Sequence, residues 1–392
     1  MHSLISSPSF MRSEKAYKDI LDAISDEGRL RSLCHSRDEG MLDCTSNDYM
    51  GLGADKELLQ SFVASLDSNS VFGSCASRLL FTGADRYAAL EDYLECEYER
   101  KALIFNSGYH ANTGIIPALC AADDTLIVAD KLVHASIIDG MKLSGAKFRR
   151  FKHNDVSALR RILESESSRY QRLLVVVESV YSMDGDEAPL RDIIALKDSC
   201  PAMMLYVDEA HAFGVRGDRG LGLCEELGVE PDILIGTLGK AAASTGAFAI
   251  TSDVIKDYLV NTCRSLIFST AIPPVSVDWS LHSLKRLRQM QIERKRIAEM
   301  SVDLSSFIAN LTGVGEVHSS PIIPLHAGGN ERVVALAEAM KRHGVMALPI
   351  RRPTVAAGTE RVRISLHASM STEDISRIKY AAEKAFNESG IL

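Results

Sequence analysis

One stretch, residues 232–246, constrains the fold of this chain more than any other. A buried strand at 233–235 runs into a turn of small residues, and Lys240 lies in that turn. The small neighbours leave room around its ammonium group, and no carboxylate stands beside it in sequence. Such a lysine loses its proton more easily than a solvated one and can then attack a carbonyl. Most lysines that follow a strand are solvated loop charges, so this interpretation depends on the rest of the chain.

Two further apolar strands, at 173–178 and 205–208, end in the same way. The first leads to Ser182, and the second ends at Asp208 with His211 three residues on. Near-continuous apolar runs of this kind are typical of strands in a parallel sheet. Ligands of open α/β sheets bind at the carboxyl ends of such strands. The polar residues and the lysine are therefore candidates for one ligand site.

The order of these residues resembles that of fold-type I pyridoxal-phosphate enzymes, and more narrowly that of the α-oxoamine synthases. Three motifs carry the resemblance: Ser-Met-Asp-Gly at 182–185, Asp-Glu-Ala-His at 208–211 and Gly-Thr-Leu-Gly-Lys at 236–240. The resemblance runs from about residue 15 to the C-terminus. It implies an α/β fold with a mainly parallel central sheet flanked by helices, followed by a smaller α+β C-terminal domain.

The domain organisation that we expect has three parts. Residues 1–45 form an N-terminal helical segment, residues 46–280 a large cofactor-binding domain, and residues 281–392 the small domain. Residues 275–310 have the pattern of one long helix.

The resemblance also implies how the cofactor, pyridoxal 5'-phosphate, is held. Lys240 would carry it covalently, Asp208 would pair with its ring nitrogen, and His211 would reach its ring oxygen. Ser182 would hold the ring, and His134, in the motif Asp-x-x-x-His-Ala-Ser, would stack on it. The expected catalytic residues are Lys240, His134, Asp208 and His211.

A strand followed by a helix predicts a phosphate site. Small and polar residues after the strand at 102–105 enter an apolar helix, which leaves free backbone N–H groups at the positive end of the helix dipole. The resemblance implies that Ser107, Gly108 and Tyr109 contact the cofactor phosphate there, together with Thr237.

The segment 268–274 resembles the family's Phe-Ser-Thr-x-x-Pro-Pro. In the family this threonine reaches the cofactor phosphate of the neighbouring subunit. The resemblance therefore implies the same role for Thr270, and a homodimer with shared active sites.

The C-terminal region carries a signature for the substrate. Residues 350–363 resemble Ile-Arg-Pro-Pro-Thr-Val-Pro-x-Gly-Thr-x-Arg-Leu-Arg, the version found in the 8-amino-7-oxononanoate synthases, with Arg352 in place of the first Pro and Ala356 in place of the last. Arg351 is the expected carboxylate-binding residue, because its planar fork matches a carboxylate, and Thr354 is expected near the substrate. The doubled arginine leaves a one-residue ambiguity between Arg351 and Arg352.

Other candidate substrate residues have a structural interpretation beside the functional one. Arg31 aligns with an arginine that helps to bind the acyl substrate in these synthases, but the residues alone favour a charge at the C-terminal end of a helix. Asn47 lies in a segment, Ser-Asn-Asp-Tyr-Met-Gly, that is near the active site in the family, and it equally suits a plain turn. Arg361 and Arg363 alternate with apolar residues, which is typical of a strand face.

The glycine-rich loop of the family, Gly-Ser-Gly-Gly-Ser-Arg, is altered at residues 73–78. Cys75 and Ala76 stand where glycines are usual. A positive φ at either position would cost more with a β-carbon. The alteration bears on the loop geometry and the acyl-substrate contacts more than on the cofactor.

The function implied by the resemblance is the decarboxylative condensation of an amino acid with an acyl-CoA or acyl-ACP substrate. The 350–363 segment favours L-alanine with a pimeloyl thioester, which gives 8-amino-7-oxononanoate, a step of biotin biosynthesis. The alternatives are a sister synthase that joins glycine to acetyl-CoA or succinyl-CoA, or serine to a long acyl chain. A different class of protein, a subunit that has the fold without the activity, is disfavoured because Lys240, Asp208 and His211 are intact.

Composition limits the remaining possibilities. The net charge of −8 disfavours a nucleic-acid partner. The eight cysteines show no C-x-x-C spacing, so reduced thiols in a cytoplasmic protein are expected rather than disulfides or a metal site. No run approaches 18 apolar residues, so no membrane span is expected.

Overall fold

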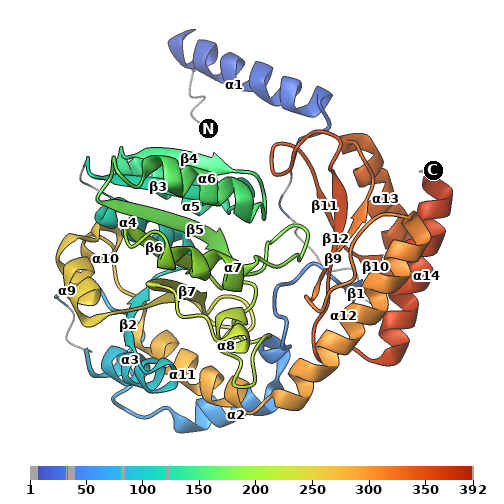
Figure 1. Cartoon of the computed structure of the whole chain (residues 1–392). Coiled ribbons are helices and arrows are strands. Elements are labelled where there is room, and N and C mark those ends of the chain that lie inside the picture. Colours follow the sequence, from blue (N-terminus) through green and yellow to red (C-terminus); the bar gives the residue numbers. More distant parts are fainter. Residues whose placement is uncertain (1–7, 32, 34–39, 81–83, 121–122, 391–392) are drawn as a thin grey trace.

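A seven-stranded sheet forms the centre of the part of the chain that is described in the computed structural model, residues 8–31, 33, 40–80, 84–120 and 123–390 (Figure 1). Its strands lie in the order β2-β8-β7-β6-β5-β3-β4. The strands are β2 (Lys101–Phe105), β3 (Thr125–Asp130), β4 (Lys147–Phe151), β5 (Arg172–Glu178), β6 (Met203–Asp208), β7 (Ile233–Thr237) and β8 (Ala247–Thr251).

The predicted mainly parallel sheet is confirmed. Strands β4, β3, β5, β6 and β7 pair in parallel along the sheet, and β8 runs antiparallel to both of its neighbours, β7 and β2. The five parallel strands therefore end at the same edge of the sheet, which is where the sequence predicts the site.

Helices cover both faces of this sheet because alternate side chains of each strand point to opposite sides. Val175 and Val177 belong to one apolar cluster, and Leu174 and Val176 belong to the other. The first face packs on α3 (Ala84–Tyr98), α6 (Val156–Glu166), α7 (Leu190–Ile194) and α11 (Pro274–Arg288). The second packs on α4 (Gly108–Leu119), α5 (Ala135–Ser144), α9 (Asp253–Thr262) and α10 (Arg264–Ile267).

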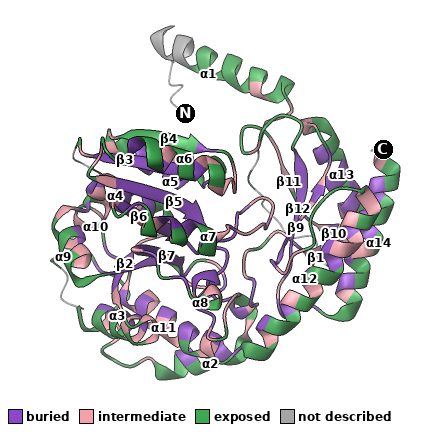
Figure 2. Cartoon of the chain, viewed as in Figure 1, coloured by how far each residue is buried: buried purple, intermediate pink, exposed green. Residues whose placement is uncertain are grey.

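A smaller region beside the large sheet contains the predicted α+β arrangement. Its antiparallel sheet has the order β11-β12-β9 and lies beside three helices (Figure 1). The strands are β9 (Ile322–His326), β11 (Leu348–Ile350) and β12 (Arg361–Ser365), and the helices are α12 (Gln291–Thr312), α13 (Asn330–Arg342) and α14 (Thr372–Ser389). Two of these helices, α12 and α13, contact the strands of this sheet, and α14 packs on both of them. Burial follows the two sheets, whose strands are mostly buried, whereas the described side chains of α1 (Pro8–Asp26) are mostly exposed (Figure 2).

The N-terminal part of the chain also contributes to the smaller region. The short strand β1 (Leu42–Asp43) pairs in parallel with β10 (Val345–Met346). The remaining elements are the helices α2 (Lys56–Ser65) and α8 (Leu223–Leu227) and the 3₁₀ turns η1 (Leu52–Ala54) and η2 (Ala195–Asp198). The predicted boundaries at residues 45 and 280 stay predictions.

The expected single helix at 275–310 is wrong. It is divided into α11 and α12 at Gln289–Met290, where the backbone N–H of Gln289 turns back to the carbonyl of Arg286. Arg294 stabilises the break by donating to the carbonyl of Leu287 at 2.8 Å. The break lets α11 pack on α3 while α12 packs on α14. Neither Gln nor Met breaks helices by its own propensity, so the sequence pattern did not reveal it.

The described residues contain no helix that is both long enough and apolar enough to cross a lipid bilayer.

A close crossing of α4 and α5 gives a prediction for stability. A β-carbon at Gly140 would lie 2.6 Å from the carbonyl oxygen of Asn112, so Gly140→Ala must push the two helices apart. We expect a loss of about 1–3 kcal/mol in the free energy of unfolding, because overpacking against backbone is not easily relieved. Leu143→Ala, on an exposed side chain of the same helix, is the control and should change it by less than about 0.5 kcal/mol. Denaturant titrations measure the free energy of unfolding, and an equal loss in both variants would contradict this packing.

Candidate active site

Three neighbouring strands bring polar side chains to one edge of the large sheet. Glu178 ends β5 and Asp208 ends β6, and these two residues are paired in register. Thr237 ends β7 beside them. By the alternation of side chains, all three point to the face that carries α4 and α5. Each is buried, so the strand ends form the floor of the site.

The Asp208 carboxylate is held in a fixed orientation. Its Oδ2 accepts from Asn112 Nδ2 at 2.8 Å, and its Oδ1 accepts from the backbone N–H of Ala210 at 2.9 Å. Asn112 in turn donates to Ser136 Oγ at 2.9 Å and accepts from the hydroxyl of Tyr206 at 2.6 Å. A buried carboxylate with two donors is oriented toward whatever cation or N–H group enters the site.

Sequence reasoning missed Asn112. It lies on the buried face of α4, among apolar residues. An amide on an otherwise apolar helix face was the available signal, because such a group is buried only where it finds hydrogen-bonding partners.

Lys240 and His211 are in direct contact. Lys240 Nζ lies 2.7 Å from His211 Nε2. Burial lowers the pKa of the Lys240 ammonium to about 8, with Arg363 adding to the effect and Asp208 and Glu178 opposing it. Burial also holds the pKa of His211 well below its ordinary value, with the charges of Lys240 and Arg363 acting in the same direction. The site therefore combines a readily deprotonated amine with a neutral imidazole.

His134 caps α5 at the same edge. Its Nδ1 lies 2.8 Å from Ser136 Oγ, and its backbone N–H donates to Glu178 Oε1 at 2.5 Å. Burial, together with the nearby Asp208, raises the pKa of Glu178 well above its ordinary value. Glu178 is a second residue that sequence reasoning missed, since a carboxylate at the end of a strand is common in any α/β protein. It fixes the backbone that carries His134.

The predicted phosphate site is the N-terminus of α4. Ser107 caps this helix by accepting from the backbone N–H of His110 at 3.2 Å, and Gly108 is its first residue. The hydroxyl of Tyr109 donates to Asp139 Oδ2 on α5 at 2.5 Å. Asn106 binds the carbonyl of Thr270 at 2.7 Å, and the Thr270 side chain is exposed. Ser107, Gly108 and Tyr109 therefore lie at one helix end, with Thr270 at the surface beside it.

The buried Ser182 is carried by a loop that is fixed by ionic contacts. Asp184 pairs with Arg361 of β12, and Asp186 pairs with His153, whose Nε2 lies 2.6 Å from Asp186 Oδ2. The loop from β5 is thus tied to the smaller sheet. It is one of the connections that hold the two sheets together at the site.

The candidate substrate residues form two groups, and each group makes its contacts with a different part of the chain. Asn47 Oδ1 accepts from Arg363 Nη2 at 3.0 Å and faces the hydroxyl of Tyr49, which lies 2.7 Å from His211 Nδ1. This group therefore borders the Lys240–His211 contact. Arg363 is buried and belongs to it, so the interpretation of Arg363 as a plain strand-face residue is incomplete.

The second group joins the end of α1 to the 351–354 segment. Arg31 Nη2 donates to Thr354 Oγ1 at 3.0 Å, and Arg351 Nη1 donates to the carbonyl of Gly28 at 3.0 Å. Arg352 precedes a cis peptide bond to Pro353, and its backbone N–H binds Asn330. Arg31, Arg351 and Thr354 are thus brought together, as two guanidinium groups beside a hydroxyl.

The altered glycine loop keeps a conformation that suits glycine. Cys75 has φ = 53°, whereas Ala76 is not among the positive-φ residues. The left-handed conformation costs an L-residue roughly 1–2 kcal/mol. Ser74 Oγ donates to the carbonyl of Ala271 at 2.5 Å, which fixes the loop against the Thr270 segment. The altered loop and the Thr270 segment line a cavity of ≈ 490 Å³, and Asn106 and Thr245 also line it.

Comparison with known proteins identifies the family. The family model for aminotransferase class I and II matches residues 39–381. A Pasteurella multocida protein is 47% identical over 86% of this chain and 88% of its own length, and a Neisseria meningitidis protein is 43% identical over 92% and 98%. Both carry the provisional name 8-amino-7-oxononanoate synthase.

Solved structures agree with the sequence relatives. A serine palmitoyltransferase from S. paucimobilis, bound to a pyridoxal-phosphate–myriocin aldimine, has a TM-score of 0.88 at 25% identity and covers 97% of this chain and 99% of its own. The 8-amino-7-oxononanoate synthase of Francisella tularensis has a TM-score of 0.74 at 28% identity and covers 90% and 98%.

This chain belongs to the α-oxoamine synthase family. It is a pyridoxal-phosphate-dependent acyltransferase with the fold-type I architecture. The predicted family, fold and cofactor are confirmed.

The donor set of this α-oxoamine synthase fits its cofactor. The oriented Asp208 carboxylate suits a protonated ring nitrogen, and the amine of lowered pKa suits an aldehyde. The N-terminus of α4 suits a phosphate. Among the residues that the structure describes, no group of three or more His, Cys, Asp and Glu side chains is placed to hold a metal ion.

The lowered pKa of Lys240 predicts how the synthase takes up its cofactor. Only the neutral amine attacks the aldehyde, so after cofactor removal the rate of incorporation should rise about tenfold per pH unit and level off near pH 8. Absorbance spectroscopy measures this rate. A free lysine derivative, with a pKa of about 10.4, is the control. A rate that keeps rising to the pH of the control would show that the Lys240 pKa is not lowered.

Proposed function

We propose that this α-oxoamine synthase condenses L-alanine with a pimeloyl thioester to give 8-amino-7-oxononanoate. Carbon dioxide and the thiol carrier, coenzyme A or acyl carrier protein, are the other products. The observation that carries the proposal is the Lys240–His211 contact beside Asp208, in a chain whose relatives carry this name. The 350–363 segment supports the same subgroup of the family.

The same geometry supports a proposal for the residues that hold the cofactor. Bound pyridoxal phosphate supplies an electron sink for the carbanion at the amino acid's α-carbon. Lys240 is the residue proposed to carry it, Asp208 to bind its ring nitrogen, and His211, His134 and Ser182 to contact its ring. The phosphate contacts proposed are the residues at the N-terminus of α4 and two threonines: Ser107, Gly108, Tyr109, Thr237 and Thr270.

Lys240 is also the proposed general base, once the amino group of alanine has displaced it from the cofactor and freed its amine. With a pKa of about 8, its amine is partly neutral near pH 7 and can take the α-proton of alanine. The ammonium so formed can return a proton after carbon dioxide is lost. His211, at 2.7 Å, keeps the amine in place during both transfers.

The two arginine groups suit two different carboxylates. Arg363 is buried in hydrogen-bonding contact with Asn47 and Tyr49, next to His211. We therefore assign the carboxylate of alanine to Arg363, which revises the assignment to Arg351 from sequence. Arg351, with Arg31 and Thr354, is assigned to the distal part of the acyl substrate, where a pimeloyl chain ends in a carboxyl group.

A homodimer with shared sites belongs to the same proposal. Exposed apolar side chains lie on the Thr270 segment and on the loop that hydrogen-bonds to it: Phe268, Phe72, Leu79 and Leu80. An apolar surface of this kind is typical of an interface, and a second copy of the chain would bring its own Thr270 to the neighbouring phosphate. Sedimentation velocity tests this, and a monomer at micromolar concentration would contradict it. A cytoplasmic location, expected from the cysteine pattern, remains part of the proposal.

A second candidate is supported by the structural comparison. The serine palmitoyltransferase structure has a higher TM-score, 0.88, than the 8-amino-7-oxononanoate synthase structure, 0.74. Sequence identity favours the 8-amino-7-oxononanoate synthase function, since the relatives that are 43–47% identical carry that name. The same assay decides between them.

The substrate assignment is tested with purified, cofactor-loaded protein. Alanine, glycine or serine is supplied with acetyl, succinyl, pimeloyl and palmitoyl thioesters, on both carriers for pimeloyl, and the amino ketone is measured by mass spectrometry. We expect product from alanine with the pimeloyl thioester, none from Lys240→Ala, and an unchanged rate from Lys142→Ala, which alters an exposed lysine. Preference for serine and palmitoyl would overturn the assignment while leaving the family intact.

Conservative variants test the assignment of the alanine carboxylate to Arg363 and of the acyl substrate to Arg351. Arg363→Lys loses the planar fork beside Tyr49, so the KM for alanine should rise roughly 10- to 100-fold, as expected for a lost charged hydrogen bond. Arg351→Lys should instead raise the KM for the pimeloyl thioester and leave that for alanine within about threefold. Steady-state kinetics with each substrate varied in turn gives both values. The reverse pattern would restore the assignment of alanine to Arg351.

A further inference from the structure

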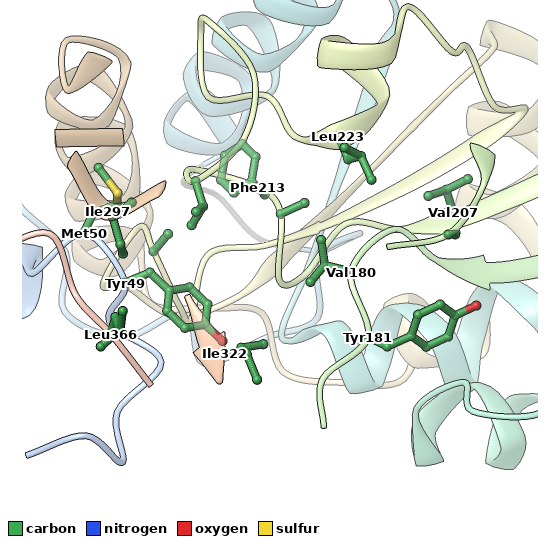
Figure 3. Close-up of a cluster of buried hydrophobic side chains, with 14 of the residues drawn as sticks. Tyr49, Met50, Val180, Tyr181, Val207, Phe213, Leu223, Ile297, Ile322 and Leu366 are labelled. Carbon is green, nitrogen blue, oxygen red and sulfur yellow. The ribbon is translucent and has the colours of Figure 1, made fainter. Parts of the chain in front are cut away.

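The hydroxyl group of Tyr49 lies at the centre of a buried set of polar contacts. It is 2.7 Å from His211 Nδ1, 3.0 Å from Asn47 Oδ1 and 3.0 Å from Arg363 Nη2. The side chain has 0% exposure and packs in the apolar cluster that also contains Met50, Ile322 and Leu366 (Figure 3). A tyrosine that only filled this cluster would not need three polar partners.

The donors and acceptors of this set are constrained. A guanidinium only donates, so both the Tyr49 oxygen and Asn47 Oδ1 accept from Arg363 Nη2. The single hydroxyl proton of Tyr49 then goes either to Asn47 Oδ1 or to His211 Nδ1. In the first case Nδ1 carries a proton and donates it to Tyr49. In the second case Nδ1 accepts from Tyr49.

Whether His211 Nδ1 carries a proton decides whether the other ring nitrogen, Nε2, is a hydrogen-bond acceptor or a donor. A proton on Nδ1 of the neutral ring leaves a lone pair on Nε2, and a free Nδ1 leaves an N–H on Nε2. Nε2 faces Lys240 Nζ at 2.7 Å. The charged or titratable groups that act on this imidazole are Lys240, Arg363 and His134. A hydroxyl can donate or accept, so Tyr49 satisfies Nδ1 in both states, whereas a phenyl ring satisfies neither.

We propose that Tyr49 is a positioning residue that holds His211 through Nδ1 and connects it to Arg363. Arg363 is the arginine assigned above to the amino-acid carboxylate, so the proposal rests on the proposed function at that point. When the carboxylate binds Arg363, it alters the hydrogen bond that Arg363 donates to the Tyr49 oxygen. The hydrogen bond between Tyr49 and His211 Nδ1 is altered in turn, on the imidazole beside Lys240. The substrate site and the base are thereby joined through one hydroxyl group.

The test is Tyr49→Phe in the cofactor-loaded enzyme, with Tyr98→Phe as the matched control. Tyr98 donates its hydroxyl proton to the carbonyl of Leu221 at 2.9 Å, outside this set of contacts. His211 is observed by ¹⁵N NMR of histidine-labelled protein and assigned with His211→Asn. In Tyr49→Phe we expect the Nδ1 signal of His211 to move, and the pH midpoint of the cofactor's visible absorbance to shift, with neither change in Tyr98→Phe.

Kinetics supply a second readout. Loss of one buried hydrogen bond predicts a fall in kcat of about tenfold in Tyr49→Phe, with the KM for the amino acid within about threefold. An unchanged His211 Nδ1 signal in a folded Tyr49→Phe protein would overturn the proposal.

If Tyr49→Phe does not fold, the wild-type protein decides the question. Exchange broadening or a through-bond coupling between the Tyr49 hydroxyl proton and His211 Nδ1 supports the proposal, and a His211 Nδ1 signal typical of a solvent-exposed nitrogen overturns it. These NMR measurements do not depend on which substrates react. A failure of the substrate assay therefore leaves the role of Tyr49 separately tested.

Discussion

The contact between Lys240 Nζ and His211 Nε2 is the interaction on which the site depends. The two residues lie on loops that leave the neighbouring parallel strands β6 and β7. Parallel pairing places the ends of both strands at one edge, so residues that are 29 apart in sequence meet at 2.7 Å. Burial then sets their chemistry, because it lowers the pKa of the amine and keeps the imidazole neutral. In water near pH 7 the amine would be almost fully protonated, and the imidazole would be charged in part.

The surrounding polar groups are held by partners of their own. Asp208 is oriented by Asn112, and Asn112 by Tyr206 and Ser136. On the other side, Arg363 of the smaller sheet reaches Asn47 and Tyr49, so the smaller sheet closes the site over the large one. A network of this kind is costly if any member is left unpaired. This explains why so many of the residues around Lys240 are buried together with their partners.

Sequence reasoning predicted the parallel sheet and the residues at its edge because both follow from local patterns. The apolar runs of β5, β6 and β7 identify buried strands, and the motifs after them identify Asp208, His211 and Lys240. The edge strand β4 was not predicted, because its residues are mostly charged and exposed. Its pairing with β3 is a tertiary contact that no local pattern contains.

The substrate residues were harder to predict for the same reason. Arg351 and Arg363 lie twelve residues apart and look alike in sequence, and only the pairing of β12 with β9 and β11 determines that Arg363 points toward His211. Asn112, Glu178 and Tyr49 act through partners that are distant in sequence. Residues that are proposed to touch the cofactor are thus visible in motifs, whereas residues that hold them in place become visible only in the fold.

The central claim is that Lys240 is the residue that carries the cofactor. Borohydride reduction of the cofactor-loaded enzyme makes the bond between lysine and cofactor permanent, and peptide mass spectrometry then locates it. The account predicts the added mass on the peptide that contains Lys240, with none remaining in Lys240→Ala. Added mass on another lysine of the folded protein, with Lys240 unmodified, would contradict the account.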